Sequence, residues 1–279
     1  MTYLAKTIRN VGAALRRPAL ALDYAGWALQ NRFRSGGAIR NVCGVTLGSF
    51  NGFSEFHSVA RGVSSAEQYF LSTFPFRDGA ILDIGANLGL FALVVRNVLP
   101  DRRIIAFEPA PSTFAALSSN VARNNASNIE CRQLAVSDRD GMVPFVVREN
   151  ARANSSIGTP GSNRGTTSID IPCVTLDSYA SETQIGRIAL LKVDVEGFEE
   201  AVFAGASRVL STLRPQLVYF EVCPALARAC GFAGDQAAAR LEEHGYLLHR
   251  IRSDGGFEKA DRSGIAQVTL ENWLGICPD

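Results

Sequence analysis

The sequence has little net charge, few histidines and no closely spaced pair of cysteines. Its 279 residues carry 28 basic and 27 acidic side chains, so a formal charge of +1 offers no general attraction to nucleic acid. With only three histidines and six scattered cysteines, none in a C-x-x-C pair, the chain shows neither a zinc pattern nor a disulfide framework. We therefore expect reduced thiols, a cytoplasmic location and no nucleic-acid partner.

Long apolar runs are also missing. No stretch reaches the roughly 18–20 residues that span a bilayer, and the N-terminus has neither a compact apolar core nor a small-residue cleavage site. We therefore predict no transmembrane helix and no signal peptide. An apolar content of 47% and a charged content of 20% fit a soluble globular protein with one large α/β domain and additions.

Positive charge is concentrated at the N-terminus. Residues 1–40 hold seven basic residues and one acid, for a charge of +6, and the remainder holds 21 basic and 26 acidic residues, or −5. The basic residues are Lys6, Arg9, Arg16, Arg17, Arg32, Arg34 and Arg40. Apolar spacing predicts a helix over 3–16 and a second helical stripe, Leu22, Ala25 and Leu29, after Pro18.

We expect these helices to form a cap whose apolar stripes pack on the domain. Contact of residues 1–35 with an anionic membrane or with a partner is the alternative. Residues 41–62 show no clear period, and we expect them to be irregular with one short strand. The predicted organisation is therefore an N-terminal extension over 1–62 and a main domain over 63–279.

The most informative stretch is a strand followed by a glycine-rich turn and a helix. Residues 80–83 predict the strand, Gly85 and Gly89 bracket Asn87, and an apolar run over 88–99 predicts a helix that ends before Pro100. Glycines let a backbone approach a ligand, and the free N–H groups of a helix start face it. This order predicts a nucleotide-binding corner.

The identity of the nucleotide follows from the charges and glycines of this corner. The dinucleotide pattern G-x-G-x-x-G is not met, because Asn87 stands at its second glycine and Leu90 at its third. Asp83, at the strand end, would repel a pyrophosphate. S-adenosylmethionine has no phosphate but carries an ammonium and a sulfonium group, which carboxylates stabilise. The corner therefore favours S-adenosylmethionine over NAD.

Two further strand ends supply candidate ligands for a nucleoside. Residues 103–107 predict a second strand, followed by Glu108, 23 residues after Gly85. This is close to the ~20-residue spacing at which a carboxylate accepts ribose hydroxyls. After a helix over 111–124, residues 129–136 predict a third strand. Ser137 and Asp138 follow it, and we expect them beside adenine.

Residues 141–175 interrupt the alternation of strands and helices. Residues 142–147 and 169–175 predict two antiparallel strands, separated by a polar loop over 148–167. Loops of this length in compact domains are often functional, so this one is a candidate lid or acceptor-binding segment; plain disorder is the alternative. Glu67, on a helix predicted over 64–74, is most simply a solvated residue, with a role at the cofactor site as the alternative.

A second informative stretch is an apolar strand that ends in alternating charges, Lys192, Asp194 and Glu196. Alternation along a strand places the three on one side, at the carboxyl edge of the sheet where ligands bind. They could provide a general base for a hydroxyl, orient the sulfonium end, or ligate a divalent metal together with Glu221. We predict no metal.

The remaining C-terminal elements alternate between helices and strands. We predict a helix from Glu199 to about Leu210, a strand over 216–220 and a helix that ends over 241–245. Residues 246–251 and 266–270 predict a terminal antiparallel pair.

With these motifs in hand, the chain resembles the FkbM family of S-adenosylmethionine-dependent methyltransferases. The matching segments are LDIGANLG (82–89), AFEP (106–109), LAVSD (134–138), Ser155-Ser156, TLD (175–177), LKVDVEGFE (191–199) and NWL (272–274). The resemblance implies an α/β fold, a Rossmann-like seven-stranded, mostly parallel sheet with helices on both faces. One strand is antiparallel, as in class I methyltransferases.

The resemblance also implies S-adenosylmethionine as the donor and a small-molecule hydroxyl, of a sugar or a natural product, as the acceptor. Cofactor-binding positions implied by the motifs are Asp83, Gly85, Asn87, Gly89, Glu108, Ser137 and Asp138. Lys192, Asp194 and Glu196 would face the reactive centre, with Asp194 or Glu196 accepting the proton. The alternatives are a non-catalytic nucleotide-binding protein of the same fold and an NAD-dependent oxidoreductase.

Overall fold

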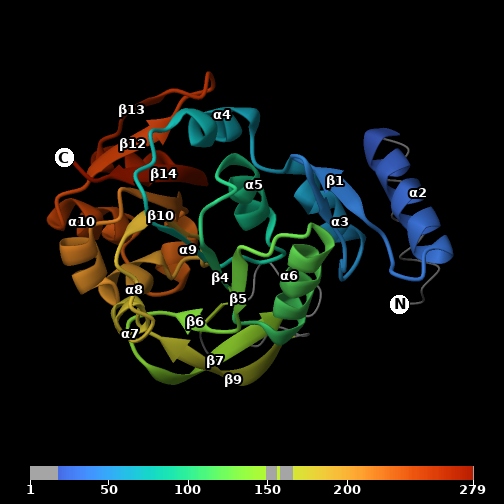
Figure 1. Ribbon diagram of the computed structural model, residues 1–279, viewed down its shortest axis with the longest axis horizontal. Coiled ribbons are helices and arrows are strands. Elements are labelled where there is room, and N and C mark those ends of the chain that lie inside the picture. Colours follow the sequence, from blue (N-terminus) through green and yellow to red (C-terminus); the bar gives the residue numbers. More distant parts are fainter. Residues whose placement is uncertain (1–17, 149–155, 158–165, 279) are drawn as a thin grey trace.

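A computed structural model describes residues 18–148, 156–157 and 166–278. Its centre is an eight-stranded sheet in the spatial order β13-β12-β14-β11-β10-β3-β4-β5 (Figure 1). The strands are β3 (Ala80–Ile84), β4 (Ile104–Phe107), β5 (Ile129–Arg132), β10 (Ile188–Val193), β11 (Leu217–Val222), β12 (Leu247–Ile251), β13 (Phe257–Lys259) and β14 (Glu271–Ile276).

The five strands from β5 to β11 are parallel, and β14 lies antiparallel between β11 and β12. The predicted Rossmann-like, mostly parallel sheet is confirmed, and β13 adds an antiparallel strand at its edge.

Helices cover both faces of the sheet. They are α4 (Ser65–Thr73), α5 (Leu90–Val98), α6 (Pro111–Arg123), α7 (Leu176–Glu182), α8 (Glu199–Ala204), α9 (Pro224–Ala229) and α10 (Gln236–Glu243). Ile81 and Leu190 pack with α4, α5 and α6, whereas their neighbours Leu82 and Leu191 pack with α7, α8 and α10. Because both faces are buried, these strands are almost entirely apolar, so a charged residue within them needs a specific partner.

A second, four-stranded sheet lies beside the first, in the order β6-β9-β7-β8. Its strands are β6 (Ala135–Val136), β7 (Gly141–Arg148), β8 (Ser156–Ile157) and β9 (Thr166–Val174). The predicted antiparallel pairing of the segments now seen as β7 and β9 is confirmed. The prediction of one strand over 129–136 was wrong, because β5 belongs to the central sheet and β6 pairs with β9.

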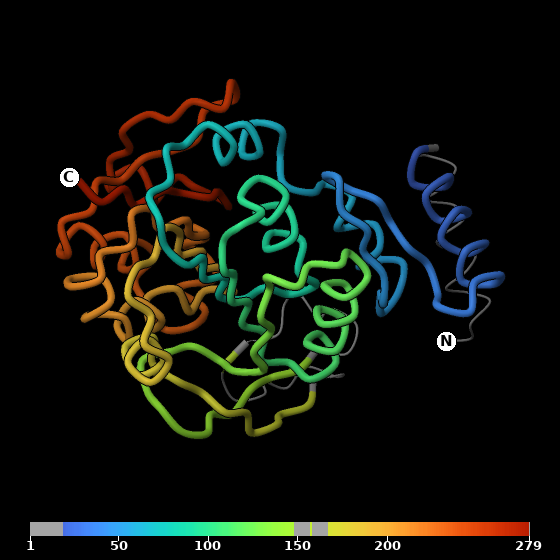
Figure 2. Tube along the Cα trace, viewed as in Figure 1, coloured from blue at the N-terminus to red at the C-terminus, as the bar shows by residue number. Residues whose placement is uncertain are grey.

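The N-terminal elements lie to one side of the sheet, as the blue trace of Figure 2 shows. They are α2 (Pro18–Phe33), β1 (Arg40–Val42), β2 (Val45–Leu47), α3 (Phe53–Ser58) and the 3-10 helix η1 (Val59–Arg61). Residues 41–62 were expected to be irregular with one short strand, and this was wrong, because two strands, a helix and a 3-10 helix occupy most of the range. The side chains of Asn124 and Asn120 accept the N–H groups of Thr46 and Gly48 at 2.9 and 2.8 Å and so attach the β1–β2 hairpin to α6.

The apolar stripe of α2 faces outward and does not pack on the domain as expected. Leu22 and Leu29 are 76% and 58% exposed, and Ala25 is exposed as well. The expectation that this stripe packs on the domain was therefore wrong. The helix predicted over 3–16 lies outside the described residues.

Two C-terminal boundaries also differ from prediction. The helix expected to run to about Leu210 ends at Ala204, and a π-helix, η3 (Val209–Leu213), starts where the Asp177 carboxylate accepts the N–H groups of Arg208 and Val209. The strand expected over 266–270 is wrong. The 3-10 helix η4 (Arg262–Gln267) occupies part of that range, and the terminal strand is β14.

No helix among the described residues is long and apolar enough to cross a membrane.

The close approach of Gly205 to the backbone of Ser137 makes a testable contribution to stability. A Cβ atom at Gly205 would stand 2.0 Å from the Ser137 carbonyl oxygen, whereas one at Gly186 would meet nothing within 4 Å. We expect Gly205→Ala to lower the free energy of unfolding by about 1–3 kcal/mol or more. Gly186→Ala should change it by less than about 0.5 kcal/mol. Urea denaturation measures both, and equal stabilities would contradict the close approach of Gly205 to the Ser137 backbone.

Candidate active site

The glycine corner after β3 is shaped by the protein's own backbone. Gly85 has a φ of +78°, and a Cβ atom there would lie 1.9 Å from the carbonyl oxygen of Asp194. The N–H of Asp194 in turn donates to the Ile84 carbonyl at 3.1 Å. Gly85 is therefore required because the ends of β3 and β10 approach so closely. Gly89, with a φ of +86°, lies against the side chain of Leu117.

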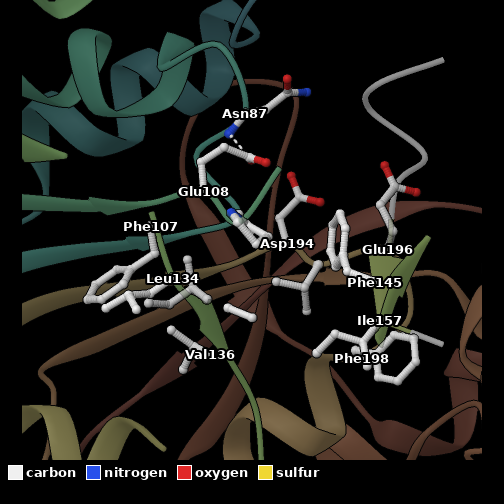
Figure 3. A pocket seen from close by; sticks show the side chains of 15 residues that line it. Asn87, Phe107, Glu108, Leu134, Val136, Phe145, Ile157, Asp194, Glu196 and Phe198 are labelled. Atoms are coloured by element: carbon white, nitrogen blue, oxygen red, sulfur yellow. Dashed lines mark hydrogen bonds between the residues drawn. The ribbon is translucent and has the colours of Figure 1, made fainter. Parts of the chain in front are cut away.

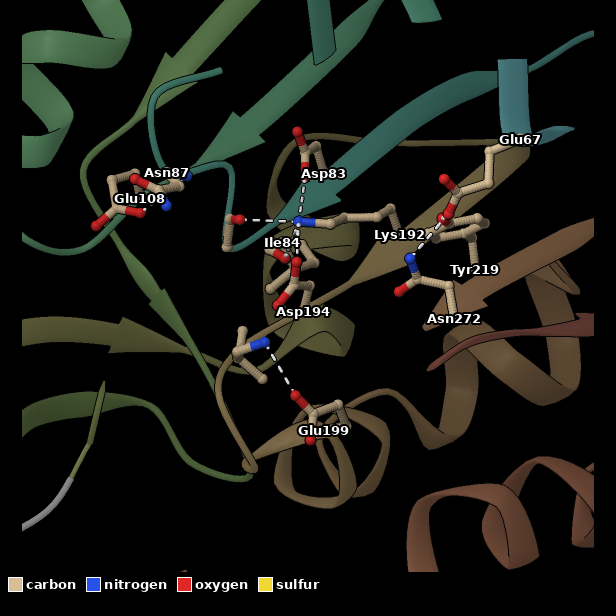
Figure 4. Close-up of polar contacts among 12 residues, drawn as sticks. Glu67, Asp83, Ile84, Asn87, Glu108, Lys192, Asp194, Glu199, Tyr219 and Asn272 are labelled. Carbon is tan, nitrogen blue, oxygen red and sulfur yellow. Dashed lines mark hydrogen bonds and ion pairs between the residues drawn. The ribbon is translucent and has the colours of Figure 1, made fainter. Parts of the chain in front are cut away.

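The ammonium of Lys192 lies at the centre of a buried polar cluster beneath this corner (Figure 4). Its Nζ is 3.0 Å from Asp83 Oδ1 and 3.5 Å from Asp194 Oδ2, and it donates to the Gly85 carbonyl at 2.8 Å. Lys192 is 4% exposed and Asp83 is fully buried. Lys192 therefore ties the ends of β3 and β10 together from below.

The protonation state of Lys192 follows from its neighbours. Burial alone would lower its pKa, but the carboxylates of Asp83 and Asp194 raise the pKa above its ordinary value. Lys192 is thus a permanent cation that cannot accept a proton at neutral pH. Asp194, by contrast, keeps 39% of its side chain exposed.

A first cavity opens above the corner on the side of β4 and the second sheet (Figure 3). Asn87, Glu108, Asp194 and Glu196 gather toward one end of it, and apolar side chains form the rest. The apolar lining comprises Ile84, Phe107, Leu134, Val136, Phe145, Ile157, Val195 and Phe198, together with Pro109 and Ala135. Among its described lining residues, three are carboxylates and none is basic.

Glu108 is held in place by two backbone N–H groups. Its Oε2 accepts from Asn87 at 3.1 Å and its Oε1 accepts from Ala110 at 3.0 Å. Burial raises the pKa of Glu108 to about 7, against the opposing effect of these hydrogen bonds. Asn87 adopts a φ of +50°, which asparagine tolerates better than most residues. The predicted juxtaposition of Glu108 with the corner is observed.

Glu196 reaches the first cavity from a turn and not from a strand. The strand β10 ends at Val193, and Glu196 has a φ of +57°. The expected alternation of Lys192, Asp194 and Glu196 along one extended strand was therefore wrong beyond Asp194. The buried carboxylate of Glu199 holds this turn, because its Oε1 accepts from the N–H groups of Val195 and Gly197 at 3.0 and 3.2 Å.

Glu221 adds a fourth acidic group near this edge of the sheet. Burial raises its pKa to about 9, and the negative charges of Asp194, Glu196 and Glu199 act in the same direction. Burial and these charges both favour the protonated form of Glu221. The described residues contain no group of three or more histidine, cysteine or acidic side chains arranged to hold a metal ion.

A second cavity lies on the other side of the corner, toward α4 and β14. Gly85, Asn87 and Asp194 line both cavities, and Lys192, Phe91 and Tyr219 line the second. The two cavities therefore meet at Gly85, Asn87 and Asp194, of which Asp194 carries the ionisable group.

Three polar residues from distant segments form one wall of the second cavity. Glu67 accepts from the Tyr219 hydroxyl and from Asn272 Nδ2, the latter at 2.9 Å, while also accepting from the Ser64 N–H at 2.8 Å (Figure 4). The expectation of a solvated Glu67 was wrong. Only its place in the S-x-x-E capping box was readable from the sequence.

The other candidate residues lie around the cavities. Asp83 is buried beneath the corner, and Gly89 starts α5. Ser137 is buried and Asp138 is an exposed residue that pairs with Arg139, and neither is among the described residues lining the first cavity. The adjacent Leu134, Ala135 and Val136 line it instead. Of the proposed lid over 148–167, residues 149–155 and 158–165 lie outside the described residues, and Ile157 lines the first cavity.

The buried Lys192–Asp83 pair allows a direct test of what holds the corner. Lys192→Met leaves the Asp83 carboxylate buried without its cation, so we expect the free energy of unfolding to fall by about 3–5 kcal/mol. The double variant Lys192→Met/Asp83→Leu removes both charges and should recover most of that loss. Urea denaturation of the two variants measures the difference, and a double variant no more stable than Lys192→Met would show that the pair does not set the stability.

Comparison with known proteins agrees with this geometry. Residues 83–248 match the family described as Methyltransferase FkbM domain. Methyltransferase 1 of Beauveria bassiana is 28% identical over 67% of this chain and 79% of its own length, and methyltransferase sdnD of Sordaria araneosa is 30% identical over 62% and 76%.

A third relative carries the family's name. The 31-O-demethyl-FK506 methyltransferase FkbM of Streptomyces tacrolimicus is 30% identical over 58% of this chain and 72% of its own length. The family match covers more than half of the chain and includes the corner, Glu108 and the Lys192–Glu196 segment. The protein belongs to the FkbM methyltransferase family.

Proposed function

We propose that this methyltransferase transfers the methyl group of S-adenosylmethionine to a hydroxyl group of a small molecule. The observation that carries the proposal is the position of the Asp194 carboxylate where two cavities meet. One cavity has the features of a nucleoside site, and the other has a polar wall suited to a hydroxylated acceptor.

The first cavity fits the adenosine part of the cofactor. The Glu108 carboxylate, fixed by two N–H groups, suits the ribose hydroxyls, and the apolar lining with Phe145 and Phe198 suits a purine. The absence of basic residues among the described lining residues disfavours a pyrophosphate, whereas three carboxylates favour a cationic ligand. When bound, S-adenosylmethionine supplies an electrophilic methyl group on its sulfonium.

The charged residues near the point where the cavities meet would have different roles. Asp194, partly exposed and facing both cavities, would accept the proton of the acceptor hydroxyl. Lys192 would be a positioning residue, because it is a buried cation that orients Asp194 and the corner. Glu196 would add negative charge beside the sulfonium. Alignment of the hydroxyl with the methyl group would supply most of the rate acceleration.

The second cavity would hold the acceptor. Glu67, Tyr219 and Asn272 present a carboxylate, a hydroxyl and an amide that can exchange hydrogen bonds with a hydroxylated ring, and Phe91 offers an apolar surface. An O-methylated product is supported by the name of the Streptomyces relative, which refers to a 31-O position. The 2-O-methyltransferase NoeI of Sinorhizobium fredii, 27% identical over 52% of this chain, supports it in the same way.

Calorimetric titration with S-adenosylhomocysteine tests the cofactor assignment, with NADH as the control ligand. We expect binding of S-adenosylhomocysteine alone. Burial raises the pKa of Glu108 to about 7, so the carboxyl is mostly protonated below that pH. It must then lose its proton before it can accept hydrogen bonds from the ribose hydroxyls, which weakens binding at low pH. The Kd should therefore fall by about fivefold from pH 6 to 7 and by about tenfold from pH 6 to 8, and level off above pH 8.

The matched control is Glu108→Gln, which removes the titrating group and keeps the shape. This variant should bind more weakly at pH 8 and show no rise in affinity between pH 6 and 8. A wild-type Kd that does not change with pH would argue against the ribose role of Glu108. Binding of NADH alone would overturn the cofactor assignment.

Asp194→Asn separates proton acceptance from cofactor binding. Transfer of labelled methyl is measured with hydroxyl compounds, drawn from methyl glycosides and polyketide alcohols, that the wild type methylates. We expect the variant to lose at least about a hundredfold in kcat, in line with the loss of a general base. Its Kd for S-adenosylhomocysteine should stay within about threefold of the wild-type value. Undiminished kcat would remove Asp194 from the mechanism.

A further inference from the structure

The helix α2 is apolar on two opposite faces. Its inner face packs on α3, where the rings of Tyr24 and Trp27 lie 5.1 and 5.8 Å from the ring of Phe53. On the same face, Asp23 pairs with Arg40 and His57. The side chain of Asn31 accepts the N–H of Ala38 at 2.8 Å. These contacts fix the orientation of the helix.

The outer face carries the apolar side chains Leu22, Ala25, Leu29 and Phe33. Their spacing of three or four residues places them within one narrow arc, on the side turned away from Phe53. Leu22, Leu29 and Phe33 are 76%, 58% and 75% exposed. Figure 1 shows α2 at the periphery of the molecule, with this helix set apart from the central sheet.

This exposure is unusual within the described residues. Nine large apolar side chains are exposed there, and three of them, Leu22, Leu29 and Phe33, lie on the outer face of α2. Of the others outside α2, Leu247 and Phe257 lie on the paired strands β12 and β13, and Tyr69, Met142 and Leu270 lie on other segments. A contiguous row of exposed apolar side chains marks an interaction surface, so the outer face of α2 is a surface that another body would cover.

The charges around this face indicate what that body is. Asp23 is the only acidic residue of α2, and its pairing with Arg40 and His57 keeps it on the inner side. Arg32 and Arg34 are exposed at the C-terminal end, and the Arg32 guanidinium lies 5.8 Å from the ring centroid of Phe33. Apolar side chains bordered by cations match the interface of an anionic lipid membrane.

We propose that the outer face of α2 binds the surface of an anionic membrane. The helix lies parallel to the surface, with Leu22, Leu29 and Phe33 in the boundary between headgroups and acyl chains. Arg32 and Arg34 pair with lipid phosphates. This contact places the enzyme at a membrane, and it does not depend on the identity of the acceptor.

Flotation of the full-length protein with lipid vesicles tests the proposal. Vesicles of phosphatidylcholine with 30% phosphatidylglycerol are compared with vesicles of phosphatidylcholine alone. We expect the wild type to bind the anionic vesicles. Arg32→Gln/Arg34→Gln should weaken this binding by about fivefold for each arginine removed. Leu22→Gln/Leu29→Gln/Phe33→Gln should weaken it by at least about tenfold.

The matched control is Met142→Gln/Leu247→Gln/Leu270→Gln, which removes three comparably exposed apolar side chains from other elements. It should bind vesicles as the wild type does. Circular dichroism and the Kd for S-adenosylhomocysteine should be unchanged in every variant, because none of the substituted residues lines either cavity.

Three outcomes would overturn the proposal. One is a wild type that does not float with anionic vesicles, and another is a triple α2 variant that floats as well as the wild type. The third is a wild-type dimer in sedimentation equilibrium that the triple α2 variant converts to a monomer, without vesicle binding by either. That result would assign the face to a second copy of the chain.

Discussion

The active-site edge of the sheet depends on the contacts that the buried ammonium group of Lys192 makes with its neighbours. This ammonium lies inside an otherwise apolar layer, where an unpaired charge would cost several kcal/mol. The Asp83 carboxylate, the Asp194 carboxylate and the Gly85 carbonyl together compensate for its burial. Since these groups come from the ends of β3 and β10, the requirement to satisfy one cation fixes how the two strands end relative to each other.

The backbone segments around that cation also pack closely against one another. Gly85 admits the Asp194 carbonyl, and Gly197, with a φ of +97°, admits the backbone of Leu226. Glu199 then holds the turn that carries Glu196. As a result, Asp194 is held on a closely packed segment of backbone between the two cavities. A proton acceptor in this position can serve a cofactor bound on one side and an acceptor bound on the other.

The parts of this arrangement that the sequence predicted are those encoded in short segments. The order of strands and helices was predictable because the apolar runs that form them end at glycine or proline residues. The meeting of Gly85, Glu108 and Asp194 follows because parallel strands present their carboxyl ends at one edge. The limit of this reasoning is visible at Glu196, where alternation fails because the strand has already ended.

Contacts between distant segments were not predictable in the same way. Glu67 meets Tyr219 and Asn272 across 152 and 205 residues of chain, and no local pattern in any of the three segments indicates the others. The outer face of α2 shows a related ambiguity, because a stripe that packs on a domain and a stripe that faces outward have the same spacing. Only the position of the helix against Phe53 separates them. The adenine roles of Ser137 and Asp138 stay predictions, as do the domain boundary near residue 62 and the other site roles.

A crystal structure of the complex with S-adenosylhomocysteine tests the central claim most directly, since that claim concerns which cavity holds which ligand. The account predicts the ribose hydroxyls on Glu108, the adenine among the apolar residues of the first cavity, and the sulfur atom on the side of Asp194. The wall formed by Glu67, Tyr219 and Asn272 would stay open to solvent. Adenosine bound against that wall, with the first cavity empty, would contradict the account.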